Sequence, residues 1–300
     1  MSPSGPGGPR SDLTRPQPAR SSPARSTPGR PQGSRATLGA FLTRGLLAGL
    51  VAGLASFGVA YVVGEPALTA AIAVEDGTDP GQADGSEHEH PGTAGSGHEH
   101  AADGTVVPRS LQSTVGLATG TVVAGVTLGG FLGLLTALAL GRLGRTGPRA
   151  TALGLAAGGF VSVQLVPFAA YPPNPPGVGD PATIGLRTAS YAVLLAISVI
   201  AASAALLGGR GLRPRWGSWY AGVATAVGYL LVVCIVIALL PGFDEVPADY
   251  PATLLYRFRA AGLLTQLTLW GVLGLALAEL TGRLVAHPAS ATGSLLPVGT

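Results

Sequence analysis

The 300-residue sequence predicts an all-α, polytopic integral membrane protein with about six transmembrane helices. Only 11% of the residues are charged, and 46 are glycine, a composition typical of membrane helices that contact one another through small residues. Six stretches are apolar and close to the roughly 20 residues that a helix needs to cross a bilayer. They are residues 45–63, 116–140, 151–170, 188–207, 219–240 and 260–281.

The charges between these stretches sort by sign and predict an orientation. The first five stretches carry no charge, and the sixth carries only Glu279, near its end. If both termini lie on one side, that side holds 14 of the 18 basic residues, and the other holds 13 of the 15 acidic residues. Because arginine beside a span favours the cytoplasm, both termini are predicted to be cytoplasmic, in a multi-pass protein of the cell membrane.

The regions outside the spans differ in composition. Residues 1–36 are rich in Arg, Pro and Ser and are expected to form a disordered cytoplasmic tail, as are residues 285–300 at the other end. The membrane domain is predicted at 37–284, with a long outer loop at 64–115. The arginines of the N-terminal tail lie among Pro, Ser and Gly without interleaved aromatic residues, so no nucleic-acid partner is expected.

The outer loop contains a doubled His-Glu-His element, which makes it a candidate metal site. Its residues are His88, Glu89, His90, His98, Glu99 and His100. Imidazole with carboxylate suits borderline divalent metals such as cobalt, nickel, zinc and copper. Residues two apart in an extended segment point the same way, so each element can present two rings to one ion. The alternative is a solvated, low-complexity acidic loop.

Two further outer loops combine closely spaced prolines with charged residues. Prolines cannot continue a helix, so these loops are predicted to be stiff turns at the mouth of the helix bundle. The candidate pathway or entrance residues are Asp180, Arg187, Asp244, Glu245, Arg257 and Arg259. The arginines at 257 and 259 are expected to pair with the neighbouring acids. The alternatives are a plain rigid hairpin for the first loop and interfacial anchoring of the last helix for the second.

No feature of the sequence predicts an enzyme or a tightly bound cofactor. The His-Glu-His elements lack the His-Glu-x-x-His spacing of a zinc hydrolase, and no phosphate-binding Gly-x-x-x-x-Gly-Lys motif is present. The polar residues within the spans are few, chiefly Gln164 and Gln266, with no acid or histidine at mid-membrane. Since intramembrane ionisable groups usually mark ion paths, this argues against a proton-coupled pump carried by this chain alone.

The two Pro-rich segments nevertheless resemble a known family. The pattern from Pro167 to Asp180, continued by Gly185–Thr188, is similar to that of the CbtA family of proposed cobalt-transporter subunits. So is the pattern from Leu240 to Ala252, continued by Arg257–Arg259 and Trp270. The resemblance extends over about residues 40–284 and includes the acidic, histidine-containing outer loop.

The resemblance implies a membrane subunit of a cobalt uptake transporter that supports cobalamin synthesis. Cobalt(II) or a similar divalent metal would be the substrate, and a small, single-span CbtB-like membrane subunit would be the partner. The rival hypothesis is a non-transporting membrane protein that binds metal, or acts as a scaffold, and buffers metal for a partner.

Overall fold

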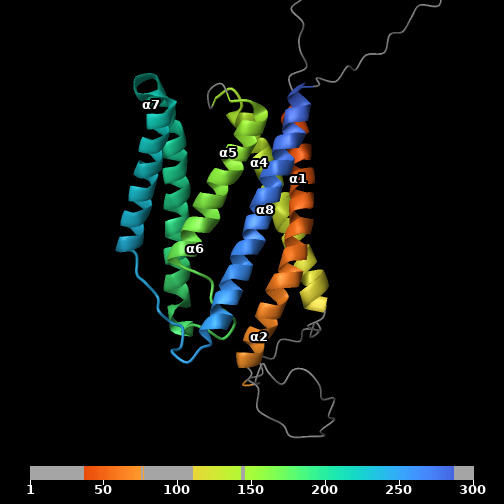
Figure 1. Ribbon diagram of the computed structural model, residues 1–300, viewed down its shortest axis with the longest axis vertical. Helices are drawn as coiled ribbons and strands as arrows, with labels where there is room; N and C mark the ends of the chain where they lie inside the picture. The colour runs from red at the N-terminus through yellow and green to blue at the C-terminus, as the bar shows by residue number, and fades with distance from the viewer. Residues whose placement is uncertain (1–36, 76, 78–110, 143–145, 287–300) are drawn as a thin grey trace, which may run out of the picture. The chain divides into compact units, whose positions relative to one another are not determined.

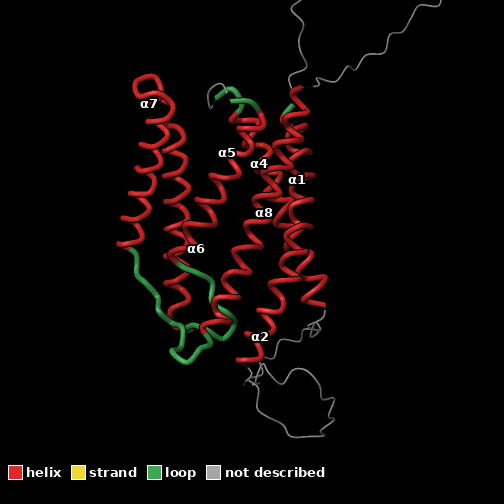
Figure 2. Tube along the Cα trace, in the orientation of Figure 1, coloured by secondary structure: helices red, strands yellow, loops and turns green. Residues whose placement is uncertain are grey.

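The computed structural model describes residues 37–75, 77, 111–142 and 146–286, which form helices and connecting loops without any strand (Figures 1 and 2). The all-helical class predicted from the sequence is therefore confirmed. Five helical segments in this part of the chain are long and apolar enough to cross a membrane. They are Leu38–Glu75, Ser113–Ala139, Pro148–Ala170, Pro181–Leu239 and Ala252–Ala286.

Three of these segments contain a wider, π-helical turn. The first segment consists of α1 (Leu38–Val59), the π-helical turn η1 (Ala60–Gly64) and α2 (Glu65–Glu75). The second consists of the π-helical turn η3 (Gln112–Gly116) and α4 (Leu117–Ala139). The third consists of α5 (Pro148–Gly159), the π-helical turn η4 (Phe160–Leu165) and α6 (Val166–Ala170). In the third, the amide of Val166 donates to the carbonyl of Val161, five residues back. Pro167 follows directly and has no amide hydrogen, so the regular helical bond is missing where the turn widens.

The fourth segment contains the turn η5 (Pro181–Thr183) and α7 (Ile184–Leu239), a helix of 56 residues that is broken at Gly217. Gly217 has φ 74° and ψ 167°, values that glycine adopts without strain. Pro214 lies three residues earlier, and Figure 1 shows the chain doubling back here. The predicted count of about six spans is not confirmed, because the fourth and fifth predicted spans lie in one very long helical segment.

Glycines bring α1 and α4 into direct backbone contact. Gly45, Gly49 and Gly53 recur every four residues on α1, and Gly125, Gly129 and Gly133 do so on α4. A Cβ atom placed on Gly49 would lie 2.1 Å from the carbonyl oxygen of Gly125, and one on Gly129 would lie 2.2 Å from that of Gly45. The two backbones can approach this closely only because neither side has side chains between them.

The last segment, α8 (Ala252–Ala286), forms the core with α1, α4 and α5 (Figure 1). Leu273 and Leu277 of α8 are fully buried, as are Ala48 and Ala52 of α1. Trp270 packs over Gly159 of α5, where an added Cβ would meet the indole ring at 2.5 Å. By contrast, α7 is held mainly through a smaller cluster of Val166, Leu194 and Val233.

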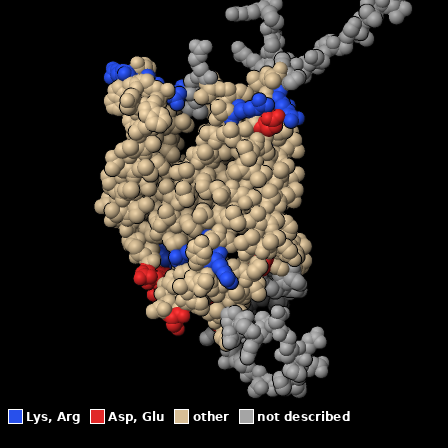
Figure 3. All heavy atoms as spheres, viewed as in Figure 1, with Lys and Arg blue, Asp and Glu red and all other residues tan. Residues whose placement is uncertain are grey.

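On the face shown in Figure 3, the described Arg, Asp and Glu residues lie at the two ends of the helices, with an uncharged band between them. At the end where α1 begins, Glu279 of α8 pairs with Arg149 at 3.0 Å and with Arg283 at 2.7 Å. At the same end, the Nε of Arg44 donates to the carbonyl of Leu280 at 3.1 Å. At the other end lie Arg187 and Glu245, which are described below.

The glycine contact makes a testable prediction about stability. Replacing Gly49 with alanine places a methyl group against the backbone of α4, so the helices must separate, and overpacking of this kind costs about 1–3 kcal/mol. Gly58, on the same helix, has nothing within 4 Å of its would-be Cβ. Gly58→Ala is therefore the matched control and should be neutral or slightly stabilising.

Thermal unfolding of both variants in detergent, followed by circular dichroism, checks this. A melting temperature for Gly49→Ala equal to that of wild type would show that α1 and α4 are not in backbone contact.

Candidate functional site

The two Pro-rich loops lie at the same end of the helices and contact each other. One connects α6 to η5 through residues 171–180, and the other connects α7 to α8 through residues 240–251 (Figure 2). Pro172, Pro173, Pro175 and Pro176 have no amide hydrogen, so this stretch cannot form helical hydrogen bonds and instead runs as an extended loop. The two loops are tied together by side chains rather than by a shared backbone ladder.

Glu245 makes the central contact between the loops. Its Oε2 forms an ion pair with Nη1 of Arg187 at 2.7 Å and accepts a hydrogen bond from the amide of Asp180 at 3.1 Å. Its Oε1 accepts a hydrogen bond from the hydroxyl of Thr183. The Glu245 side chain is 12% exposed and that of Arg187 is 29% exposed. A largely buried carboxylate needs such partners, so the pair fixes the second loop to the start of α7.

Glycine permits this close approach. Gly179 has φ 135°, and a Cβ added there would lie 2.8 Å from Nη1 of Arg187 and 3.1 Å from Oε2 of Glu245. A larger residue would therefore be strained in its backbone and would collide with the ion pair. The next residue, Asp180, caps η5: its Oδ1 accepts a hydrogen bond from the amide of Ala182 at 2.8 Å.

Two further contacts hold the loops in place. The hydroxyl of Tyr171 donates to the carbonyl of Pro241 at 3.0 Å, and its ring lies 5.9 Å from that of Phe243. Arg259, near the start of α8, donates from Nη2 to the side-chain oxygen of Asn174 at 2.9 Å and from Nε to the carbonyl of Pro173 at 3.3 Å. Three elements therefore converge on one end of the bundle.

These contacts surround a cavity of about 700 Å³. Its polar and charged lining residues are Tyr171, Asn174, Arg187, Thr188, Tyr191, Asp244 and Arg259. Asp244 is exposed and, among the described residues, makes no hydrogen bond or ion pair. Among the described residues that line the cavity, Asp244 is the one carboxylate. Tyr250 lies on the same loop, and shielding from water raises the pKa of its hydroxyl, which stays neutral.

The structure separates the predicted site residues into different roles. Asp180 caps a helix, Arg187 pairs with Glu245, and Asp244 and Arg259 line the cavity. Arg257 is exposed and does not line it. The expected pairing of the arginines at 257 and 259 with the neighbouring acids is wrong for the described part of the chain. Glu245 pairs with Arg187 instead, and Arg259 donates to Asn174 and to the carbonyl of Pro173.

The sequence pattern assigns no individual role to Tyr171, Asn174 or Thr183, although all three form hydrogen bonds across the loops. Tyr171 and Asn174 belong to the Pro-rich pattern that was recognised as a whole. Their positions within that pattern indicate that they matter. The pattern does not indicate their partners, which lie more than 60 residues away in the chain.

The histidine elements lie outside the described residues. His88, Glu89, His90, His98, Glu99 and His100 all fall within residues 78–110. In the part of the chain that the structure describes, no group of three or more His, Cys, Asp or Glu side chains is placed to hold a metal ion.

Comparison with known proteins identifies the family. The sequence model described as "probable cobalt transporter subunit (CbtA)" matches residues 38–282. The chain belongs to the CbtA family. The match includes both Pro-rich loops, every residue that lines the cavity and the histidine elements. No curated protein and no solved structure matched the chain.

Because the CbtA family is described as a probable cobalt transporter subunit, membership indicates a transporter subunit with cobalt as its substrate. Together with the apolar helices, it identifies a membrane protein. A subunit implies a partner chain. The contacts of Glu245 hold the two loops around a cavity at one end of the helix bundle.

The Glu245 contacts predict the effect of removing one charge. Glu245→Gln keeps the size of the side chain but leaves Arg187 without its anion. We expect a loss of roughly 1.5–3 kcal/mol, the usual contribution of hydrogen bonds to charged groups. Asp249→Asn, on the same loop and exposed, is the control and should melt like wild type.

A thermodynamic cycle with Arg187→Gln isolates the pair, since partners in contact give non-additive effects. Strictly additive losses of melting temperature in Glu245→Gln, Arg187→Gln and the double variant would contradict the interaction.

Proposed function

We propose that this protein is the membrane subunit of a cobalt uptake transporter and that cobalt(II) reaches it through the cavity between the two Pro-rich loops. The family match over residues 38–282 carries the functional part of the proposal. The exposed, unpaired carboxylate of Asp244 in a 700 Å³ cavity carries the structural part. The imported cobalt would support cobalamin synthesis.

The charges around the cavity favour weak, transient binding of a cation. Glu245 compensates the charge of Arg187, but Arg259 is held by a carbonyl and an amide oxygen rather than by a carboxylate. A hydrated cation at Asp244 is attracted by one negative charge while Arg259 opposes it. Conduction requires binding that is favourable enough to enter and weak enough to leave, and this balance meets that requirement.

The histidine elements would act before the cavity. His88, His90, His98 and His100, with Glu89 and Glu99, would raise the local concentration of divalent metal, since imidazole binds borderline metals well. Only neutral imidazole binds the metal, so metal binding by the loop should weaken as pH falls through roughly 6.5, the ordinary pKa of histidine. Asp180, Arg187, Glu245 and Arg259 would hold the entrance in shape, and Arg257 would lie at its rim.

The topology that we propose has both termini in the cytoplasm of the cell and the Pro-rich loops outside. The two limbs of α7, which meet at Gly217, would each cross the membrane and give six passes. A small, single-span CbtB-like subunit would complete the transporter, and the chain would not act as an enzyme. The alternative is a membrane metal-binding or scaffold protein that buffers metal for a partner without transporting it.

Fusions of a reporter to the two ends test the topology. Because the arginines gather where α1 begins and α7 reverses, both fusions should read as cytoplasmic (Figure 3). A C-terminal fusion that is active only outside the cell would remove the even number of passes, and with it the orientation of every loop.

Radiocobalt uptake tests the site. Asp244→Asn removes the free carboxylate and should lower uptake about fivefold or more, since a charge pair at 4 Å in water contributes about 1 kcal/mol. Asp249→Asn is the control for general surface charge. The alanine variant of the four loop histidines should lose uptake only at low cobalt. Rates are compared at matched protein abundance, with and without a partner subunit.

Three outcomes would contradict the proposal. Wild-type uptake in Asp244→Asn would remove the cavity from the pathway. An equal loss in Asp249→Asn would reduce the effect to general surface charge. Cobalt that is bound by membranes but never accumulates in cells, even with a partner, would favour the buffering alternative.

A further inference from the structure

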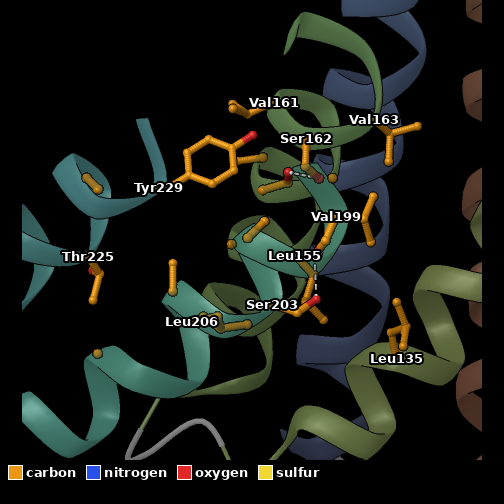
Figure 4. Close-up of a pocket in the computed structure, with 18 of the residues that line it drawn as sticks. Leu135, Leu155, Val161, Ser162, Val163, Val199, Ser203, Leu206, Thr225 and Tyr229 are labelled. Carbon is orange, nitrogen blue, oxygen red and sulfur yellow. Dashed lines mark hydrogen bonds between the residues drawn. The ribbon is translucent and has the colours of Figure 1, made fainter. Parts of the chain in front are cut away.

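A second cavity lies within the apolar band, near the reversal of α7. It has a volume of about 570 Å³ and is bounded by α4, α5 with η4, both limbs of α7, and Trp270. Figure 4 shows Leu135, Leu155, Val199 and Leu206 lining it from three of these elements. Its volume falls in the range of about 300–1,000 Å³ that is usual for ligand sites.

The hydroxyl groups in this cavity are already hydrogen-bonded. Ser162 donates to the carbonyl of Gly158 at 2.8 Å and Ser203 to that of Val199 at 2.8 Å (Figure 4). Thr225 donates to the carbonyl of Ala221 at 2.9 Å, and the hydroxyl of Tyr229 lies 2.9 Å from that of Ser198. The cavity therefore offers little to a hydrated ion, which would lose its water without replacement. An alkyl chain carries no such cost.

The mouth of the cavity is basic. Arg213 lines the cavity, and Arg210 and Arg215 lie within three residues of it. Among the described residues, none of these three arginines makes a hydrogen bond or an ion pair, and the acid at this end, Glu279, is bound by Arg149 and Arg283. The mouth thus presents unpaired positive charge beside an apolar chamber.

Aromatic residues place this mouth at the level of the lipid headgroups. Trp216, Trp219 and Tyr220 follow Arg213 at the reversal and are 53%, 75% and 68% exposed. Exposed tryptophan and tyrosine next to an apolar band are typical of the membrane–water interface. Basic pockets between transmembrane helices are also where acidic headgroups bind.

We propose that this cavity binds one anionic phospholipid, with an acyl chain among α4, α5 and α7 and the phosphate at Arg213. A transmembrane helix is not the expected occupant. A helix with its side chains is about 10 Å wide and needs about 30 Å to span the hydrocarbon core. The space that such a helix requires is several times the 570 Å³ that is present.

Native mass spectrometry of the whole protein in detergent tests the proposal, with phosphatidylglycerol and phosphatidylcholine of the same acyl chains as probes. Wild type should retain one phosphatidylglycerol in preference to phosphatidylcholine. Arg213→Gln should lower that retention about fivefold, the effect of one arginine on an anionic lipid near a surface. Arg142→Gln, at the same end but outside the cavity, should not lower it.

A second pair of variants tests the chamber itself. Gly158 lines the cavity, and nothing lies within 4 Å of its would-be Cβ, so Gly158→Leu places a branched side chain inside the cavity without a backbone clash. It should lower the retention of both lipids. Gly120→Leu, on α4 and also open but away from the cavity, should bind lipid like wild type. Circular dichroism of each variant confirms equal helix content.

Several results would overturn the proposal. They are equal retention of the two lipids by wild type, equal retention by Arg213→Gln and Arg142→Gln, and wild-type retention by Gly158→Leu. Competition by glycerol phosphate alone would show a site for the phosphate without the chain. A lipid-free dimer that buries position 158 would show that a second copy of the protein occupies this face.

Discussion

The backbone contact between α1 and α4 is the constraint on which the bundle depends. Lipid is as apolar as leucine, so helices in a membrane associate through close van der Waals contact rather than through exclusion of water. Gly49 and Gly125 allow that contact, and α8 then packs against α1 and α5 through Leu273 and Leu277. No glycine contact of this kind joins α7 to the other described helices. Helix α7 packs against the bundle around Leu194. Closer to Gly217, the apolar cavity separates α7 from α4 and α5.

The end of the bundle that carries the Pro-rich loops follows a different principle. There the helical hydrogen bonds have ended, and prolines and ion pairs hold the backbone in shape. Glu245 bonds to Arg187, to Thr183 and to the amide of Asp180, so one carboxylate fixes three points of the first segment. Stiff prolines limit the conformations that these bonds must restrict, which makes the cavity preformed.

The sequence was sufficient for the class of fold and for the family, and insufficient for the contacts. Apolar length and the sorting of charge predict membrane helices directly, because both follow from the bilayer. The fourth and fifth predicted spans correspond to the two limbs of α7, which meet at the kink at Gly217. The pairing of Glu245 with Arg187, rather than with the arginines at 257 and 259, depends on how two loops fold together, and spacing along the chain does not encode this.

Local sequence patterns also do not distinguish a carboxylate that holds the loops together from one that is exposed in the cavity. Asp180, Asp244 and Glu245 are all acids within three residues of a proline, and the sequence does not distinguish their roles. The structure gives Asp180 and Glu245 partners and leaves Asp244 exposed in the cavity. A transported cation must leave as readily as it arrives, so its binding must be weak. In the pathway that we propose, Glu245 stabilises the loops while the neighbouring Asp244 remains exposed to meet the cation.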